Sequence, residues 1–251
     1  MKELNSIFLT VVAMALLVFS VPVHASTMDD RIELTAKQSY VFKTYLQGDD
    51  IKILSKDGVV SLTGTVSENP HKALAQETVA GLPGVKSVDN RLEVKGAPPT
   101  ANSDAWLRDK VKVTLLFHRS VSSGTTNVDV KNGIVTLRGD AASQTQKDLT
   151  TEYARDVEGV ISVNNEMTLT KTPEKTRTVG EIIDDASITA QVKLALLYHR
   201  STSAINTKVE TKSGVVTLYG KASKAAELNL ATKLANDIAG VKEVNNRMTI
   251  E

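Results

Sequence analysis

Three histidines lie beyond the first 25 residues, and they are the first side chains to consider for chemistry: His71, His118 and His199. Two of them share a setting, because His118-Arg119 and His199-Arg200 each end an apolar, helix-like stretch. Arginine binds phosphate in a bidentate manner, so each pair is a candidate contact for lipid phosphate. The alternative is plain helix termination, because the helix dipole favours cations at a C-terminus.

Aromatic residues occupy the same two stretches. Trp106, Phe117 and Tyr198 either insert at a membrane interface or pack against neighbouring structure. Trp106 lies one position off the apolar stripe, and Lys110 follows it by about one helical turn. The candidate lipid-binding residues are therefore Trp106, Lys110, His118, Arg119, His199 and Arg200.

Other chemistry finds little support in the chain. There is no cysteine, which excludes disulfides, thiol catalysis and thiolate metal sites. One histidine per repeat does not supply converging metal ligands. No Gly-x-Ser-x-Gly nucleophile motif occurs, and the glycines bracket strands instead of cradling phosphate at a helix start. We predict no enzymatic activity, no metal and no cofactor. The 30 basic and 29 acidic residues give a net charge of +1 without long runs, which argues against nucleic-acid binding.

The segments of sequence that position these residues occur as three repeats. The phrase Gly-x-Val-x-Leu-x-Gly occurs at residues 58–64, 133–139 and 214–220. In each case a Gly-Val pair opens a second phrase 20 residues further on, at Gly84, Gly159 and Gly240. A fixed internal spacing in three places indicates three copies of one unit. Chemistry that needs one unique constellation fits such a chain poorly.

Each unit is predicted to run helix, strand, strand, helix, strand. Asp57-Gly58, Asn132-Gly133 and Ser213-Gly214 lie between alternating strands, as expected for two-residue hairpin turns. We therefore predict an α+β fold of three tandem α-β-β-α-β units, each a small three-stranded mixed sheet with two helices on one face. The first helix of the first unit is less regular. We align its Tyr45-Leu46 with the His-Arg pairs, which makes its link to the hairpin two residues shorter.

Nine residues are predicted to be structural. The second glycine of each hairpin phrase either lets a helix approach the sheet or relieves a bend: Gly64, Gly139 and Gly220. The later glycines suit a left-handed helix C-terminus: Gly84, Gly159 and Gly240. An asparagine stands in phase with the core in each last strand: Asn90, Asn165 and Asn246. Buried amides must be hydrogen-bonded, so we expect each to tie its strand to a loop or helix.

Domain boundaries follow from the repeats and from proline-containing linkers. We predict domains at 26–96, 103–170 and 179–251, joined by linkers at 97–102 and 171–178. Residues 1–25 resemble a secretory signal peptide, with an apolar run before Val23-His24-Ala25 and cleavage after Ala25. The alternative, an uncleaved anchor, is disfavoured because the run of about 15 apolar residues is shorter than a spanning helix. We expect the mature protein in the periplasm of a Gram-negative bacterium.

The paired phrases resemble the BON domain, a family of bacterial envelope modules, over about residues 29–251. The resemblance implies a periplasmic location, no enzymatic activity, and association with phospholipid membranes or with other envelope proteins, in envelope or osmotic stress. The leading hypothesis is therefore phospholipid binding by tandem weak contacts. The rival is a holdase-type chaperone or protein scaffold, for which exposed Val59, Val215 and Tyr219 are candidates, although Arg138 interrupts that series in the second unit. An enzyme is the third and least favoured hypothesis.

Overall fold

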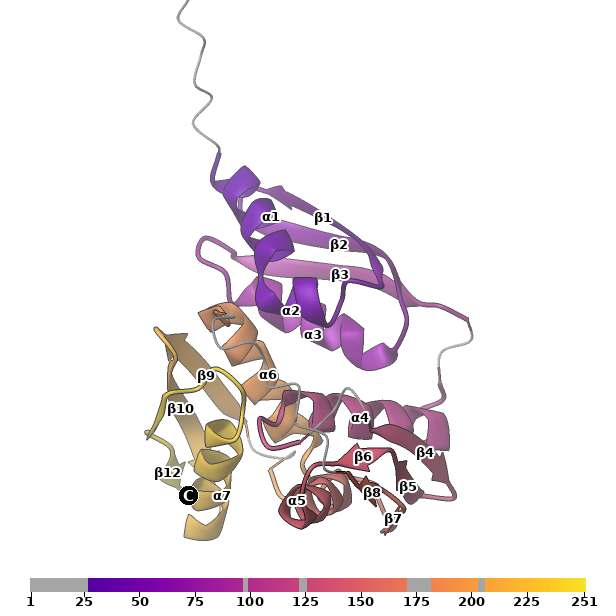
Figure 1. Cartoon of the computed structure of the whole chain (residues 1–251). Coiled ribbons are helices and arrows are strands. Elements are labelled where there is room, and N and C mark those ends of the chain that lie inside the picture. The colour runs from indigo at the N-terminus through magenta and orange to yellow at the C-terminus, as the bar shows by residue number, and fades with distance from the viewer. Residues whose placement is uncertain (1–26, 97–98, 122–125, 171–181, 203–205) are drawn as a thin grey trace, which may run out of the picture.

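The computed structural model describes residues 27–96, 99–121, 126–170, 182–202 and 206–251, which fold as three α+β domains packed together (Figure 1). The predicted signal peptide and the whole of the predicted second linker, 171–178, lie outside the described residues. Domain 1 contains α1 (Met28–Gln38), α2 (Tyr40–Thr44), β1 (Asp50–Lys56), β2 (Val59–Val66), α3 (Asn69–Ala80) and β3 (Ser87–Val94). Domain 2 contains α4 (Asp104–Phe117), β4 (Asn127–Lys131), β5 (Ile134–Arg138), β6 (Asp140–Ala141), α5 (Gln144–Arg155), β7 (Ser162–Asn165) and β8 (Thr168–Leu169). Domain 3 contains α6 (Asp185–Tyr198), β9 (Thr207–Lys212), β10 (Val215–Ala222), α7 (Ala225–Asn236), β11 (Glu243–Asn246) and β12 (Thr249–Ile250).

The three sheets are mixed and share one topology. The hairpin strands pair antiparallel, and the last strand pairs parallel to the second, in the order β1-β2-β3 in domain 1. In domains 2 and 3 the last strand is interrupted, so that β7 and β8, or β11 and β12, are successive pieces of it. The predicted fold class is therefore confirmed.

An aspartate at the start of each first helix holds the hairpin turn. Both turn residues have positive φ in all three domains, for example 52° at Asn132 and 74° at Gly133. The backbone N–H groups of these two residues donate to Asp104 at 2.7 and 2.9 Å. Asp29 and Asp185 hold the other two turns in the same way. These bonds lower the pKa of Asp104, the bond from Gly133 most of all.

The spacing of this aspartate corrects the alignment of the first unit. Each aspartate stands 29 residues before the turn glycine in all three domains, so no residues are missing from domain 1. The position of His118-Arg119 is therefore Lys43-Thr44, and not Tyr45-Leu46 as the sequence alignment assumed. The irregularity of domain 1 is instead a break at Ser39, which ends α1 and caps α2.

The in-phase asparagine joins the last strand to the second helix in every domain. The Asn165 amide donates to the Lys147 carbonyl at 2.9 Å and to Thr151 Oγ1 at 2.8 Å, while its oxygen accepts from the Met167 N–H at 2.9 Å. Asn90 and Asn246 make the equivalent contacts. Both the nitrogen and the oxygen of this partly buried amide are therefore hydrogen-bonded to neighbouring elements.

The glycines that recur at fixed spacing adopt positive φ angles, as Gly64 and Gly84 of domain 1 illustrate. Gly64 has φ of 114°, and a Cβ there would overlap the carbonyl oxygen of Asp50 in the neighbouring strand. The glycine thus permits a bend against a strand, and the close neighbour is not a helix. Gly84 has φ of 90°, but α3 already ends at its cap Gly81. The predicted helix C-terminal placement of Gly84 is therefore wrong: it lies in the following loop, where it packs against Met28 and Ile32 of the first helix.

The domains form one packed body and not a rod. One buried apolar cluster is continuous through domains 1 and 3 and takes in Val113 and Phe117 of domain 2. The remaining core of domain 2 forms a second cluster. The break at Ser39 explains part of this packing, because it frees the N–H groups of Tyr40 and Val41 to bind Asp184 and Ser187 of domain 3, at 2.7 and 3.1 Å.

Candidate functional site

The two His-Arg pairs lie in a reciprocal interface between domains 2 and 3. Arg119 of domain 2 donates to the carbonyls of Asn236, Ile238 and Val241, at the end of α7. Arg200 of domain 3 donates to the carbonyls of Arg155 and Val160, at the end of α5. Each guanidinium therefore caps the second helix of the other domain. Each arginine does place its positive charge at a helix C-terminus, as one interpretation of the sequence expected. The helix, however, is in the neighbouring domain and is not the one that the His-Arg pair follows.

Backbone contacts repeat this exchange. Arg119 N–H donates to the Asp237 carbonyl at 3.0 Å, and Arg200 N–H donates to the Asp156 carbonyl at 2.9 Å. Isolated bridges also pair His118 with Ile238, and Val157 with His199. The two domains therefore meet through the same surface on each, as in an isologous interface.

His118 is a neutral, buried ring in this interface. It is 1% exposed and stacks on Tyr153 with ring centroids 3.7 Å apart. The Tyr153 hydroxyl donates to Asp237 of domain 3 at 2.8 Å. Burial, and to a smaller degree the nearby His199, lowers the pKa of His118 to about 3. Within the described residues, His118 Nδ1 has no hydrogen-bond partner.

His199 occupies the equivalent place with a different partner. Its Nε2 lies 3.7 Å from the Asp156 carboxylate, and its Nδ1 accepts the Ser201 N–H at 3.1 Å. The hydrogen bond from His199 lowers the pKa of Asp156. A lipid phosphate at either His-Arg pair would have to displace these interdomain contacts. We therefore do not place a lipid contact at His118, Arg119, His199 or Arg200.

The predicted basic and aromatic flank exists, but its cation is buried. Lys110 is 3% exposed, and its Nζ lies 4.2 Å from the Trp106 ring centroid and 5.3 Å from that of Tyr198 in domain 3. Burial is the main cause that lowers the pKa of Lys110, and the Glu158 carboxylate at 3.5 Å opposes it. Lys110 therefore joins domains 2 and 3, whereas Trp106 stays partly exposed at the rim.

An exposed apolar pair next to this rim is absent from the sequence predictions. Ile161 is 75% exposed and Ile134 is 45% exposed. They flank the hairpin turn of domain 2, since a Cβ on Gly133 would meet Ile161. Because Asp104 binds the same turn, Trp106 in the first turn of α4 lies at this end of the domain. An alignment of the three copies could have revealed this exposed apolar residue, because domains 1 and 3 carry Lys86 and Lys242 where domain 2 has Ile161.

The remaining candidates from the sequence are His71, a metal site and the outward hairpin residues. His71 contacts Asp49 at 2.6 Å within domain 1. No group of three or more histidine, cysteine, aspartate or glutamate side chains that could hold a metal occurs in the described ranges. Of the outward hairpin residues, Val59 is 43% exposed, while Val215 and Tyr219 are half-buried. Arg138 pairs with Asp129 and Glu166. No helix among the described residues has the length and apolar character to cross a bilayer.

Three copies of one small α+β domain, of which the second and third dock through a reciprocal interface, define a tandem-repeat protein. The chain belongs to the BON domain family, which matches residues 28–96, 103–171 and 184–251.

The curated relatives have names that refer to osmotic induction, the outer membrane and haemolysis. The chain is 32% identical over 143 residues to Osmotically-inducible protein Y of Escherichia coli, covering 57% of this chain and 70% of that protein. It is 33% identical to the outer membrane lipoprotein DolP of Haemophilus influenzae, covering 49% and 61%. It is 36% identical to a 21 kDa hemolysin of Actinobacillus pleuropneumoniae, covering 62% and 72%. None of these three names refers to an enzyme.

Proposed function

We propose that this protein is a non-enzymatic, periplasmic envelope protein that binds phospholipid surfaces through one end of domain 2. The predicted signal peptide and the names of the relatives support the location. The membrane contact consists of Ile134 and Ile161, with Trp106 at their rim and Lys131 on the adjoining strand end. We call these four residues the domain 2 tip. It replaces the three tandem weak contacts expected from the sequence.

The observation that carries the proposal is the exposure of Ile161. Its side chain is 75% exposed, and Ile134 at the same hairpin turn is 45% exposed. Exposed large apolar side chains at one end of a domain indicate a protein or membrane contact. Full burial of one such side chain contributes about 1.5–3 kcal/mol, and Lys131 adds attraction to anionic headgroups.

The other two domains serve as an internal comparison. Lys86 and Lys242 stand where domain 2 has Ile161, so their tips present an ammonium group in place of an apolar surface. The Lys242 ammonium is engaged by its own hairpin, donating to the Ser213 carbonyl at 3.0 Å. Domain 2 is therefore the domain best suited to insert into a lipid interface.

Liposome flotation of residues 26–251 tests the proposal with anionic and neutral vesicles. We expect the wild-type protein to be recovered with anionic vesicles. Ile161→Asp should bind them at least about tenfold more weakly, because insertion of that side chain is lost. The matched control is Leu169→Asp, which replaces another exposed apolar residue of domain 2, 55% exposed on β8. Background recovery of the wild-type protein with both vesicles, or equal losses in the two variants, would refute the proposal.

A further inference from the structure

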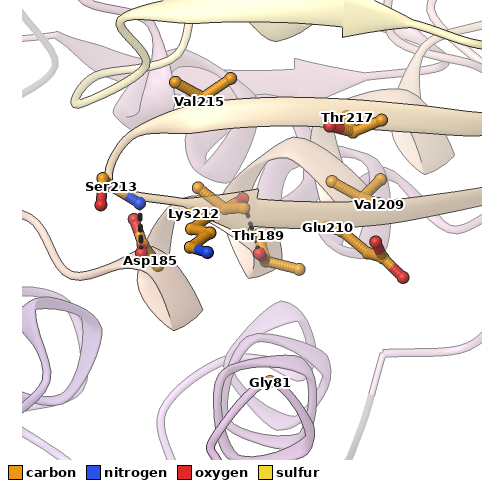
Figure 2. Close-up of a pocket in the computed structure, with 10 residues that line it drawn as sticks. Gly81, Asp185, Thr189, Val209, Glu210, Lys212, Ser213, Val215 and Thr217 are labelled. Carbon is orange, nitrogen blue, oxygen red and sulfur yellow. Dashed lines mark hydrogen bonds between the residues drawn. The ribbon is translucent and has the colours of Figure 1, made fainter.

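A groove follows the outer edge of β9, the first hairpin strand of domain 3. One part has a volume of about 810 Å³ and is lined by Val209 to Ser213, with Gly81 on the opposite side (Figure 2). A second part of about 300 Å³ lies by Asn206 and Thr207 at the start of the strand, opposite Ala73 and Glu77. The two parts are separate cavities at successive stretches of the strand, and the larger one also touches Val215 and Thr217 of β10.

Two helices complete the groove. The far wall is α3 of domain 1, which presents Ala73, Glu77 and Gly81 at intervals of four residues, and therefore along one face. The floor is α6, which presents Asp185, Thr189 and Lys193 at the same interval. Lys193 and Glu77 join floor and wall through an ion pair of 2.7 Å.

Two residues on the edge of β9, Val209 and Thr211, have outward backbone groups without a partner among the described residues. Lys212 pairs with Val215 across the two-residue turn, so alternation along the hairpin directs the N–H and C=O of Thr211 and Val209 away from β10. Among the described residues, β9 pairs with β10 alone and no strand lies on its other side. The Thr189 hydroxyl reaches only the side chain of Thr211, donating to its Oγ1 at 2.7 Å.

Domain 1 shows how the same edge is closed elsewhere. Ser55 occupies the position of Thr211, and its N–H donates to the Glu33 carboxylate at 2.9 Å. Glu33 is aligned with Thr189, whose side chain is too short to cap the backbone in this way. Domain 3 therefore lacks the cap on its edge strand that domain 1 has.

The far wall is also open where the other domains are filled. Gly81 is aligned with Asp156 and Asp237, and all three cap their helices with nearly the same backbone angles, φ of −80°, −80° and −78°. Glycine is thus not needed for conformation at position 81. Gly81 lines the groove with backbone alone, and a Cβ there would contact Ala186 of α6 at 3.4 Å.

We propose that the β9 edge binds an extended polypeptide segment of another protein as an added strand. Only a strand matches a row of outward N–H and C=O groups. Lys212 and Lys208 flank Glu210 on the outer side of β9, so an acidic–x–basic–x–acidic pattern is complementary in charge. This site goes beyond the lipid contact, which lies in domain 2.

The probe is a fluorescein-labelled octapeptide, TVEVKVET, titrated into residues 26–251 and followed by fluorescence anisotropy. The ligand control is the same peptide with N-methyl groups through its five central residues, which keeps the side chains but cannot pair. We expect saturable binding of the first peptide alone. Equal binding of both peptides, or binding of neither, overturns the proposal.

Protein variants locate the site. Thr211→Pro removes the outward N–H while sparing the ladder to β10, a change that edge strands accept, and we expect about tenfold weaker binding. Thr211→Val keeps the backbone donor and should bind as the wild type does. If Thr211→Pro is not folded, Gly81→Asp decides, because it places a carboxylate in the groove on a backbone that aspartate adopts at Asp156 and Asp237.

Each remaining result is decisive. Unchanged binding by folded Thr211→Pro, or by Gly81→Asp, overturns the proposal. A wild-type dimer in sedimentation that Thr211→Pro converts to a monomer also overturns it, because the edge then pairs with a second copy. Liposome flotation of the same variants should stay at the wild-type level, which separates failure of this site from failure of the lipid contact.

Discussion

The buried imidazole of His118 in the interface of domains 2 and 3 should make the unfolding free energy decrease in mild acid. The ring is 1% exposed, stacked on Tyr153, and close to His199 across the interface. Its pKa is lowered from 6.5 to about 3. A histidine with a depressed folded-state pKa takes up its proton more readily in the unfolded chain. Its contribution to stability is therefore fully present above pH 6.5 and is lost as the pH falls toward 3.

The size of this effect follows from the width of the window. Between the two pKa values, each pH unit costs about 1.4 kcal/mol of unfolding free energy. At pH 5 the loss attributable to His118 is about 2 kcal/mol relative to pH 7.5. This is a large fraction of the stability of a small domain.

The measurement uses the single tryptophan, Trp106, which lies in domain 2. Urea unfolding followed by its fluorescence, at pH 7.5 and at pH 5, gives the difference in unfolding free energy. His118→Phe keeps a ring against Tyr153 but cannot titrate, so the difference between the two pH values should shrink by about 2 kcal/mol. Any overpacking cost of the larger ring lowers stability at both pH values alike. An unchanged difference in the variant would refute the assigned pKa shift.

Three further predictions concern the repeated framework. Asn165→Ala should destabilise domain 2 by about 1–3 kcal/mol, measured by tryptophan fluorescence, because the strand-to-helix bonds are lost; a loss below about 0.5 kcal/mol would contradict the tie. Gly64→Ala should cost about 3 kcal/mol or more by calorimetry, whereas Gly96→Ala, with φ of 84° and open space around it, should cost about 1 kcal/mol. Asp104→Asn should lower the melting temperature at pH 7, and its deficit should shrink progressively as the pH falls below 3.8, because the lowered pKa stabilises only the ionised carboxylate; a deficit that does not shrink below that pH would exclude the charge as the cause.

Local rules of the chain predicted the hairpin turns, the strand register and the order of helices and strands in each domain. The turns at Asn132-Gly133 and its counterparts follow from residues that accept positive φ, and the strand register follows from the turn length. The anchoring aspartate was missed as an anchor, although its spacing of 29 residues to the turn glycine recurs in every copy. A constant distance between a helix start and a turn was the available signal.

Placement of the domains could not be predicted in the same way. A surface pair such as His118-Arg119 is compatible with phosphate or with a carbonyl at a helix end, and only the neighbouring domain decides between them. The sequence did hold one clue, because the pair occurs in domains 2 and 3 but is Lys43-Thr44 in domain 1. A feature shared by two of three copies fits a reciprocal contact between those two copies.

The differences between aligned positions are where the three domains acquire distinct roles. The shared framework of turn, aspartate and asparagine is satisfied in each copy, so substitutions outside it are free to change surfaces. Asp156 and Asp237 sit in the reciprocal interface of domains 2 and 3, while Gly81 at the same place opens a groove wall. Ile161 likewise replaces a lysine of the other two domains on an exposed tip. Since the proposed lipid contact and the proposed strand site lie in different domains, Ile161→Asp and Thr211→Pro should each weaken one kind of binding about tenfold and spare the other. A single variant that removed both would show that the two surfaces are not independent.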